Sequence, residues 1–161
     1  GDVEIRKALP RDADDLVRLR TIMLEQVIGG PLAESAQRNL RDFFGRWEYD
    51  EPLCLVAEED GEVLGCIAAS FYGHFPSPKN PTGMQAEIHN FAVYEQHRGK
   101  GIGKALFISI LRECRTRDVG RISLYATAMG SPIYESFGFS SEVIVCPEMR
   151  LYYRDLVELD L

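Results

Sequence analysis

The chain has 161 residues, of which 45% are hydrophobic and 27% are charged, and its formal net charge is −7 at pH 7. This length suits one hydrophobic core, so we expect a single domain over residues 1–161. No apolar run approaches the roughly 20 residues that cross a bilayer, and the charged N-terminal residues differ from a signal peptide, which favours a cytoplasmic protein with no membrane partner. The negative charge disfavours nucleic acid as a partner and weakly favours a cationic ligand such as an amine.

The four cysteines lie far apart, with no Cys-x-x-Cys pair and no histidine nearby at the spacing of metal ligands. They are Cys54, Cys66, Cys114 and Cys146. This spacing argues against a zinc site and against a disulfide framework. We therefore expect no metal and a reducing compartment.

The first third of the chain predicts one strand followed by two helices. Residues 3–9 alternate between apolar and polar side chains, as in a strand with one exposed face. Apolar residues then recur at helical spacing from Asp12 until Gly29, and again over residues 36–47. We expect most of the aromatic residues at the end of the second helix to pack in the core; these are Phe43, Phe44, Trp47 and Tyr49.

The middle of the chain predicts three strands and one long loop. Residues 53–57 and 63–69 are apolar runs on either side of Asp60-Gly61, and this dipeptide between two such runs is a strong hairpin signal. Residues 73–83 contain three prolines and predict an irregular loop. A further strand is expected over residues 87–94.

A glycine-rich stretch follows this strand and opens a helix. Three glycines alternate with basic and aliphatic residues in Arg98-Gly99-Lys100-Gly101-Ile102-Gly103-Lys104. Glycines let the backbone turn tightly and approach a ligand, and the free N–H groups of a helix start favour an anion such as a phosphate. The Ser/Thr of a Walker loop is missing, and the glycine spacing does not fit the dinucleotide fingerprint. The alternative is a turn that only starts the helix.

The remaining pattern completes an α/β fold. The helix after the glycines carries an apolar stripe from Ile102 to Cys114, and residues 122–126 predict a strand. Ser131-Pro132 opens a short helix that Gly138 ends, and two more strands are expected at residues 139–145 and 149–153. We therefore expect a central mixed, mostly antiparallel sheet flanked by helices.

Two motifs resemble the GNAT superfamily of acyl-CoA-dependent N-acetyltransferases. Residues Arg98 to Gly103 match its pyrophosphate loop, Gln/Arg-x-x-Gly-x-Gly/Ala, and follow a strand similar to the one that runs beside the pantetheine arm. Residues 133–139 are similar to its short helix with a tyrosine and a closing Gly-Phe. The resemblance covers essentially the whole chain. It implies the GNAT fold and acetyl-CoA as the acetyl donor to a primary amine.

The resemblance also implies roles for individual residues. Tyr134 would be the general acid that protonates the leaving thiolate, and Glu87 the general base, with His89 as the rival. The donor would be held by the backbone of Phe91, Ala92 and Val93, by the loop residues Arg98, Gly99, Lys100, Gly101, Ile102, Gly103 and Lys104, and by Thr127 and Tyr134. Because no cysteine falls in the motifs, direct attack of the amine is favoured over an acyl-enzyme, although the strand of Cys66 could bring that thiol close.

The sequence leaves open both the acceptor and the choice between an acetyl and a longer acyl group on the donor. In the resembled family the early helices line the acceptor pocket, so the aromatic residues at positions 43–49 could touch substrate. Tyr72, His74 and Phe75, beside the proline-rich loop, are further candidates, with a solvent-exposed loop as the alternative. A non-catalytic acyl-CoA sensor and a nucleotide-phosphate binder are alternative functions. Members of the family often form homodimers.

Overall fold

The computed structural model describes residues 1–127, 130–141 and 146–161 and divides the chain into two compact units, Gly1–Tyr125 and Ala126–Leu161. A single domain over the whole chain stays a prediction. The first unit contains β1 (Glu4–Lys7), α1 (Ala13–Ile28), α2 (Glu34–Arg46), β2 (Leu53–Glu59), β3 (Glu62–Gly73), β4 (Met84–Val93), α3 (Ile102–Thr116) and β5 (Arg121–Leu124), with short 3-10 helices at Pro10–Asp12 and Glu95–His97.

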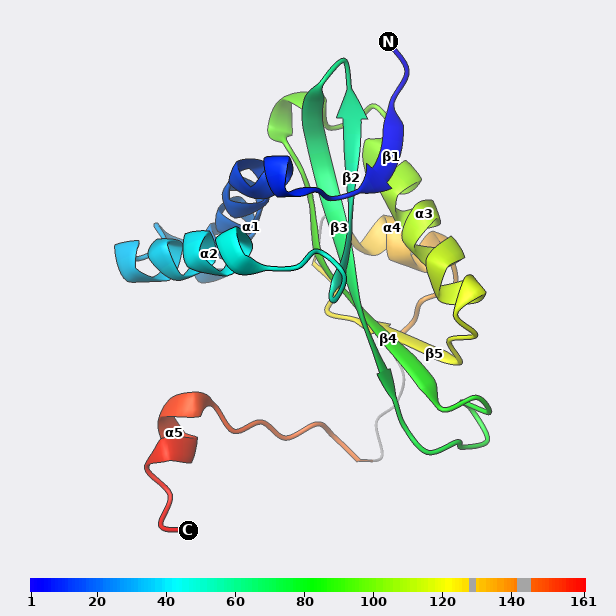
Figure 1. The fold of residues 1–161 in the computed structure, drawn as a ribbon. Helices are drawn as coiled ribbons and strands as arrows, with labels where there is room; N and C mark the ends of the chain where they lie inside the picture. Colours follow the sequence, from blue (N-terminus) through cyan, green and yellow to red (C-terminus); the bar gives the residue numbers. More distant parts are fainter. Residues whose placement is uncertain (128–129, 142–145) are drawn as a thin grey trace. The chain divides into compact units, whose positions relative to one another are not determined.

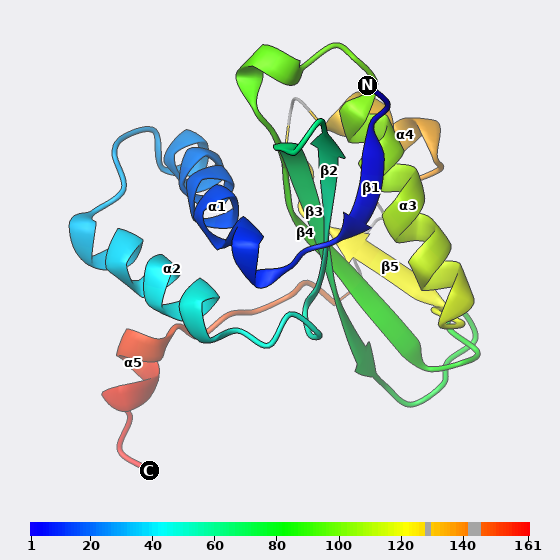
Figure 2. The same ribbon diagram turned by 45° about the horizontal axis from the view of Figure 1, so that its top comes forward.

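The first unit is a five-stranded sheet in the order β1-β2-β3-β4-β5. Neighbouring strands are antiparallel from β1 to β4, and β4 and β5 are parallel. Helices α1 and α2 cover one face of this sheet and α3 covers the other (Figures 1 and 2). The predicted mixed, mostly antiparallel sheet flanked by helices is therefore confirmed.

The hairpin between β2 and β3 forms where the sequence predicted it. Asp60 and Gly61 both have positive φ angles, 51° and 82°, which is the backbone that a tight two-residue hairpin turn needs. Both strands are longer than predicted, and β3 continues to Gly73. The proline-rich loop is consequently shorter, and its buried Asn80 accepts the Gly83 N–H at 3.1 Å.

The core lies on both faces of the sheet. On the α1 face, Leu16 and Leu19 of α1 pack with Val56 and Cys66 of the sheet. On the other face, Leu106, Phe107, Ile110 and Cys114 of α3 are buried at helical spacing, as their pattern predicted. The start of α1 is fixed by Arg6, which donates to both carboxylate oxygens of the buried Asp12 at 2.8 and 2.9 Å and to Glu58 at 2.6 Å.

The second unit contains the helices α4 (Ser131–Ser136) and α5 (Tyr153–Val157). The expected strand over residues 149–153 is wrong, because residues 149–152 have no regular structure and Tyr153 begins a helix. A short apolar run forms a strand only beside a pairing partner, and no strand in the described ranges pairs with this one. In the other expected strand, 139–145, residues 139–141 have no regular structure and 142–145 lie outside the described residues.

Candidate active site

The glycine-rich stretch forms a loop between β4 and α3 whose backbone is suited to bind an anion. Gly99 and Gly101 have φ angles of 78° and 80°, in the left-handed region that favours glycine. No side chain caps the start of α3, and its first backbone bond to this turn is the one from the Ala105 N–H to the Gly101 carbonyl at 3.1 Å. The N–H groups of the first turn therefore remain available, and the exposed side chains of Arg98, Lys100 and Lys104 add positive charge.

One edge of β4 is paired along only half of the strand. Residues Gln85 to Ile88 pair with β5, and no strand among the described residues pairs with that edge from His89 to Val93. Backbone N–H and C=O groups on an unpaired edge can bind an extended ligand. The three residues predicted to contact the pantetheine arm lie on this stretch, and Arg98 Nε donates to the Val93 carbonyl at 3.2 Å.

A β-bulge at Asn90 changes which side chains of β4 share a face. Cys66 pairs with Ala92 and Ala68 pairs with His89, so β4 has one more residue than β3 in this interval, and Asn90 has a φ of 53°. As a result, Phe91 stacks on Phe107 of α3 at 5.9 Å, whereas Ala92 packs on the α1 face. The alternation of side chains that a regular strand would have is therefore broken after His89.

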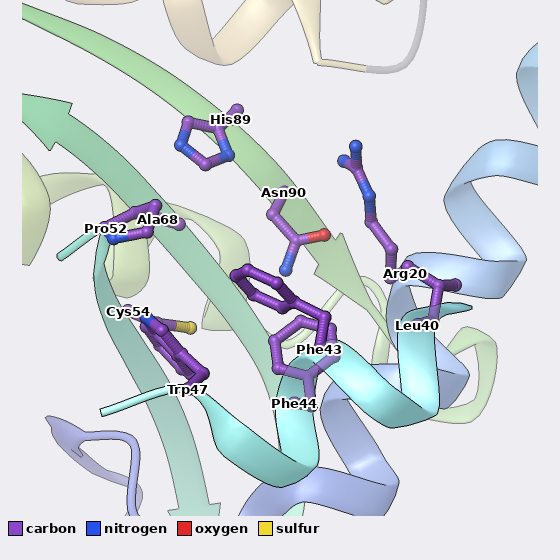
Figure 3. Close-up of a pocket in the computed structure, with 10 residues that line it drawn as sticks. All are labelled: Arg20, Leu40, Phe43, Phe44, Trp47, Pro52, Cys54, Ala68, His89 and Asn90. Carbon is purple, nitrogen blue, oxygen red and sulfur yellow. The ribbon is translucent and has the colours of Figure 1, made fainter. Parts of the chain in front are cut away.

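A pocket of about 230 Å³ lies between this part of β4 and the two N-terminal helices (Figure 3). It is smaller than the roughly 300 Å³ at the lower end of ordinary ligand sites, which indicates a small ligand. Its wall includes Phe43, Phe44 and Trp47, which are three of the four aromatic residues for which the sequence left substrate contact as the alternative to core packing. The lining residues are Arg20, Leu40, Phe43, Phe44, Trp47, Pro52, Cys54, Ala68, His89 and Asn90.

Several sequence candidates lie elsewhere. Tyr49 donates its hydroxyl to the Phe44 carbonyl at 3.1 Å and packs on the core. Tyr72, His74 and Phe75 do not line the pocket, and Phe75 is 96% exposed. Glu87 is half-buried, lies in register with Ser70 and Ser123, and does not line the pocket either.

The pocket contains polar groups that the sequence analysis missed. Arg20 interrupts the apolar stripe of α1 one turn after Leu16, and this position was the signal that could have identified it. Asn90 depends on the bulge, for which the sequence offers no comparable signal. Cys54 is buried on β2 and its strand pattern predicted only a core position.

Arg20 and His89 determine the charge of the pocket. Burial lowers the pKa of Arg20, which nevertheless stays protonated at neutral pH, and Arg20 has no carboxylate partner within the described ranges. Burial first, and then the Arg20 charge, lower the pKa of His89 below its usual 6.5. His89 Nε2 lies 2.9 Å from Ser70 Oγ. The pocket thus offers one cation and one neutral imidazole at pH 7.

Asn90 and Cys66 form a buried pair beside the pocket. The Cys66 thiol donates to the backbone carbonyl of Asn90 at 3.2 Å, and the side-chain Nδ2 of Asn90 lies 3.6 Å from Cys66 Sγ. A hydrogen bond with Cys54, together with burial, raises the pKa of the Cys66 thiol well above its usual value. Because the thiolate is the nucleophilic form, Cys66 is a poor candidate for an acyl-enzyme.

Thr127 and Tyr134 lie in the second unit, where their side chains are hydrogen-bonded to each other. Burial raises the pKa of the Tyr134 phenol, while the Thr127 bond acts in the opposite direction, so the phenol is protonated at neutral pH. Gly130 donates its N–H to Thr127 Oγ1 at 3.2 Å, and a Cβ at Gly130 would collide with the Tyr134 ring. The relation of this pair to the β4 site stays a prediction.

The described residues contain neither a cluster of metal ligands nor a membrane-spanning helix. No group of three or more His, Cys, Asp or Glu side chains in residues 1–127, 130–141 and 146–161 could hold a metal ion. In the same ranges, no helix has both the length and the apolar composition to span a bilayer.

Curated proteins with similar sequences are acetyltransferases. The chain is 28% identical over 151 residues to the mycothiol acetyltransferase of Acidothermus cellulolyticus, a match that covers 86% of this chain and 45% of that protein. It is 31% identical over 121 residues to an uncharacterised N-acetyltransferase of Archaeoglobus fulgidus, covering 72% of this chain and 76% of the relative. The chain therefore spans less than half the length of the mycothiol enzyme.

Solved structures with a similar fold include acetyltransferases. A Clostridium acetobutylicum protein described as a predicted acetyltransferase, determined with acetyl-CoA, superposes with a TM-score of 0.77 at 24% identity over 98% of this chain and 99% of that one. A GCN5-related N-acetyltransferase of Ralstonia eutropha gives 0.74 at 25% identity over 92% and 99%. The model of the Acetyltransferase (GNAT) family matches residues 17–139. Because that match covers well over half of the sequence, this chain belongs to the GNAT acetyltransferase family.

Proposed function

We propose that this chain is an N-acetyltransferase that moves the acetyl group of acetyl-CoA to a primary amine by direct attack. The observation that carries the proposal is the order of three features along β4. A strand edge that pairs with no described strand after Ile88 is followed by a basic loop suited to bind an anion, and a small pocket lies beside the same stretch. A donor with a pyrophosphate and an extended arm fits the first two features, and a small acceptor fits the third.

The donor contacts are assigned to the loop and the strand edge. The free N–H groups at the start of α3, together with Arg98, Lys100 and Lys104, would hold the pyrophosphate. The backbone of residues 91–93 would pair with the amides of the pantetheine arm. These groups bind and orient the thioester, which converts a bimolecular encounter into a positioned reaction.

The reaction requires two proton transfers. The amine nitrogen attacks the thioester carbonyl carbon, a base takes the proton that the nitrogen loses, and the thiolate that leaves when the C–S bond breaks takes a proton from an acid. We assign the acid to Tyr134, whose phenol is protonated at neutral pH. For the base, the sequence favours Glu87, but His89 rather than Glu87 lines the pocket, and its lowered pKa keeps it neutral. This placement supports His89.

The test is a thiol-release assay with acetyl-CoA and a panel of small primary amines, combined with direct measurement of acetyl-CoA binding. Turnover with at least one amine, and none with the corresponding secondary amide, would support the proposal. Saturable acetyl-CoA binding without turnover on any amine would instead favour the non-catalytic sensor. Failure to bind acetyl-CoA would contradict both.

A further inference from the structure

The pocket contains a buried hydrogen-bond acceptor that has no partner among the described residues. Asn90 is only 7% exposed, and within the described residues its Oδ1 has no hydrogen-bond partner. Figure 3 shows this oxygen directed toward the Arg20 side of the pocket. Leaving a buried polar atom unpaired is costly, so a ligand that brings a hydrogen-bond donor to this atom would be favoured. An amine supplies such a donor.

The second polar group of the pocket requires the opposite kind of partner. Arg20 is half-buried, and no carboxylate pairs with it in the described ranges. Glu51 acts electrostatically on His89 from nearby, but it is exposed and its Oε1 accepts the Phe71 N–H at 3.1 Å. A half-buried guanidinium without a counter-ion favours an anionic ligand group. The net charge of the chain weakly favoured a cationic ligand such as an amine. Arg20 indicates that the ligand also carries an anionic group.

A carboxylate fits this pocket better than a phosphate does. Arg20 is the only formally charged side chain among the residues that line the pocket, since His89 is neutral at pH 7. A phosphate group carries close to two negative charges at this pH and would bring an unbalanced charge into a largely apolar site. A carboxylate brings one charge and can accept two parallel bonds from a guanidinium.

The rest of the wall is apolar and aromatic. Phe43 and Trp47 are stacked with their ring centroids 6.2 Å apart, and Phe44 packs edge-on against both. Leu40 and Pro52 continue this surface. Such a wall favours an apolar side chain over a polar one.

We propose that the acceptor is a small amine that also carries a carboxylate, as an apolar α-amino acid does, with its carboxylate on Arg20, its amine at Asn90 and its side chain on Phe43 and Trp47. This inference rests on the proposed function, since it names the acceptor of that site. It is nevertheless tested by binding, without any need for turnover.

Trp47 makes the binding test direct, because it is the chain's single tryptophan and it lines the pocket. We would titrate the protein with L-leucine, L-methionine and L-phenylalanine, and with the three amines that lack their carboxylates, and follow tryptophan fluorescence and calorimetry. At least one amino acid should bind about 10- to 100-fold more tightly than its amine, as expected for a charge-assisted bond. Arg20→Gln should remove this difference, and Arg20→Lys should restore part of it.

The matched control is Arg41→Gln, which removes the same charge from an exposed position on α2 that does not line the pocket. It should leave the preference unchanged. Equal binding of amino acids and amines, or no binding of any of the three amino acids, would overturn the proposal. Tighter binding of the phosphonic analogue of leucine than of leucine would overturn the assignment of a carboxylate. Turnover that is equal for the amino acids and for the amines without a carboxylate would contradict this inference alone. Failure of the protein to bind acetyl-CoA would contradict the proposed function.

Discussion

His89 and Asn90 are consecutive residues of β4, yet both side chains line the same pocket. In a regular strand they would point to opposite faces of the sheet. The bulge at Asn90, with its positive φ of 53°, brings them together directly after the pairing of β4 with β5 ends at Ile88. The pocket and the open strand edge therefore meet at one backbone irregularity, which is where an acceptor amine and an acetyl thioester would have to meet.

We expect the basic side chains of the loop to determine affinity for acetyl-CoA. The double variant Lys100→Gln, Lys104→Gln should raise the KM for acetyl-CoA by about 10-fold or more, because each lysine can contribute a charge-assisted bond to phosphate. The effect should decrease at high salt, since both side chains are exposed. Steady-state kinetics at two ionic strengths measure it, with Arg41→Gln as the control. An unchanged KM would remove the loop from the donor site.

We expect Tyr134→Phe to lower kcat by about 100-fold while the KM for acetyl-CoA changes little, because the variant loses only the proton donor. Tyr153→Phe, at an 80% exposed residue of α5, is the matched control and should have wild-type activity. A Tyr134→Phe variant with wild-type kcat would show that another group, or water, protonates the thiolate.

The pH dependence of kcat/KM distinguishes the two candidate bases, His89 and Glu87. If His89 is the base, kcat/KM has an acid limb that lies below pH 6.5, because the pKa of His89 is lowered and only its protonated form is inactive. His89→Gln should then remove this limb and lower kcat by about 100-fold. Glu87→Gln should leave the limb in place. The reverse pattern, with the acid limb lost in Glu87→Gln and kept in His89→Gln, would show that Glu87 is the base, as the sequence favoured.

The stability of the first unit should depend on Asp12. Burial alone would raise the pKa of this carboxyl, but the bonds from Arg6 and from the Leu9 N–H outweigh it and hold the pKa below its usual 3.8. Asp12→Ala should lower the free energy of unfolding by about 3 kcal/mol at pH 7, since it leaves part of a buried ion pair unmatched.

The pH dependence of that loss gives an independent check. The stabilisation by Asp12 is complete above pH 3.8 and disappears as the pH falls through the lowered pKa of the folded state. Denaturant unfolding of Asp12→Ala and wild type should therefore converge in acid. Asp14→Ala, at an exposed position in the first turn of the same helix, should unfold like wild type throughout.

Local patterns predicted most of the first unit. The Asp60-Gly61 turn and the stripe of α3 are determined by neighbours in sequence, and both appeared where expected. The strand predicted over residues 149–153 is wrong because a strand needs a pairing partner, which its own residues cannot specify. Strand ends were misplaced for the same reason, as in the extension of β3 to Gly73.

The sequence predicted the loop of the candidate site but not its pocket. The glycine-rich loop is a contiguous motif, so it could be read directly. The pocket is assembled from three strands, two helices and the segment before β2, and its orientation depends on an extra residue in β4 that the alternating pattern conceals. Arg20 could have been noticed as a charge on a buried stripe, whereas its lack of a carboxylate partner among the described residues is visible only in the folded chain.

The most direct test of the central claim is to follow the acetyl group itself. The protein would be incubated with acetyl-CoA labelled with ¹³C at the carbonyl and with the amine panel, and the label would be observed by NMR. Transfer to an amine predicts that the thioester signal is replaced by that of an amide on the acceptor, with free thiol formed in equal amount. A label that remains on the thioester with every amine, or that appears only as acetate, would contradict the claim.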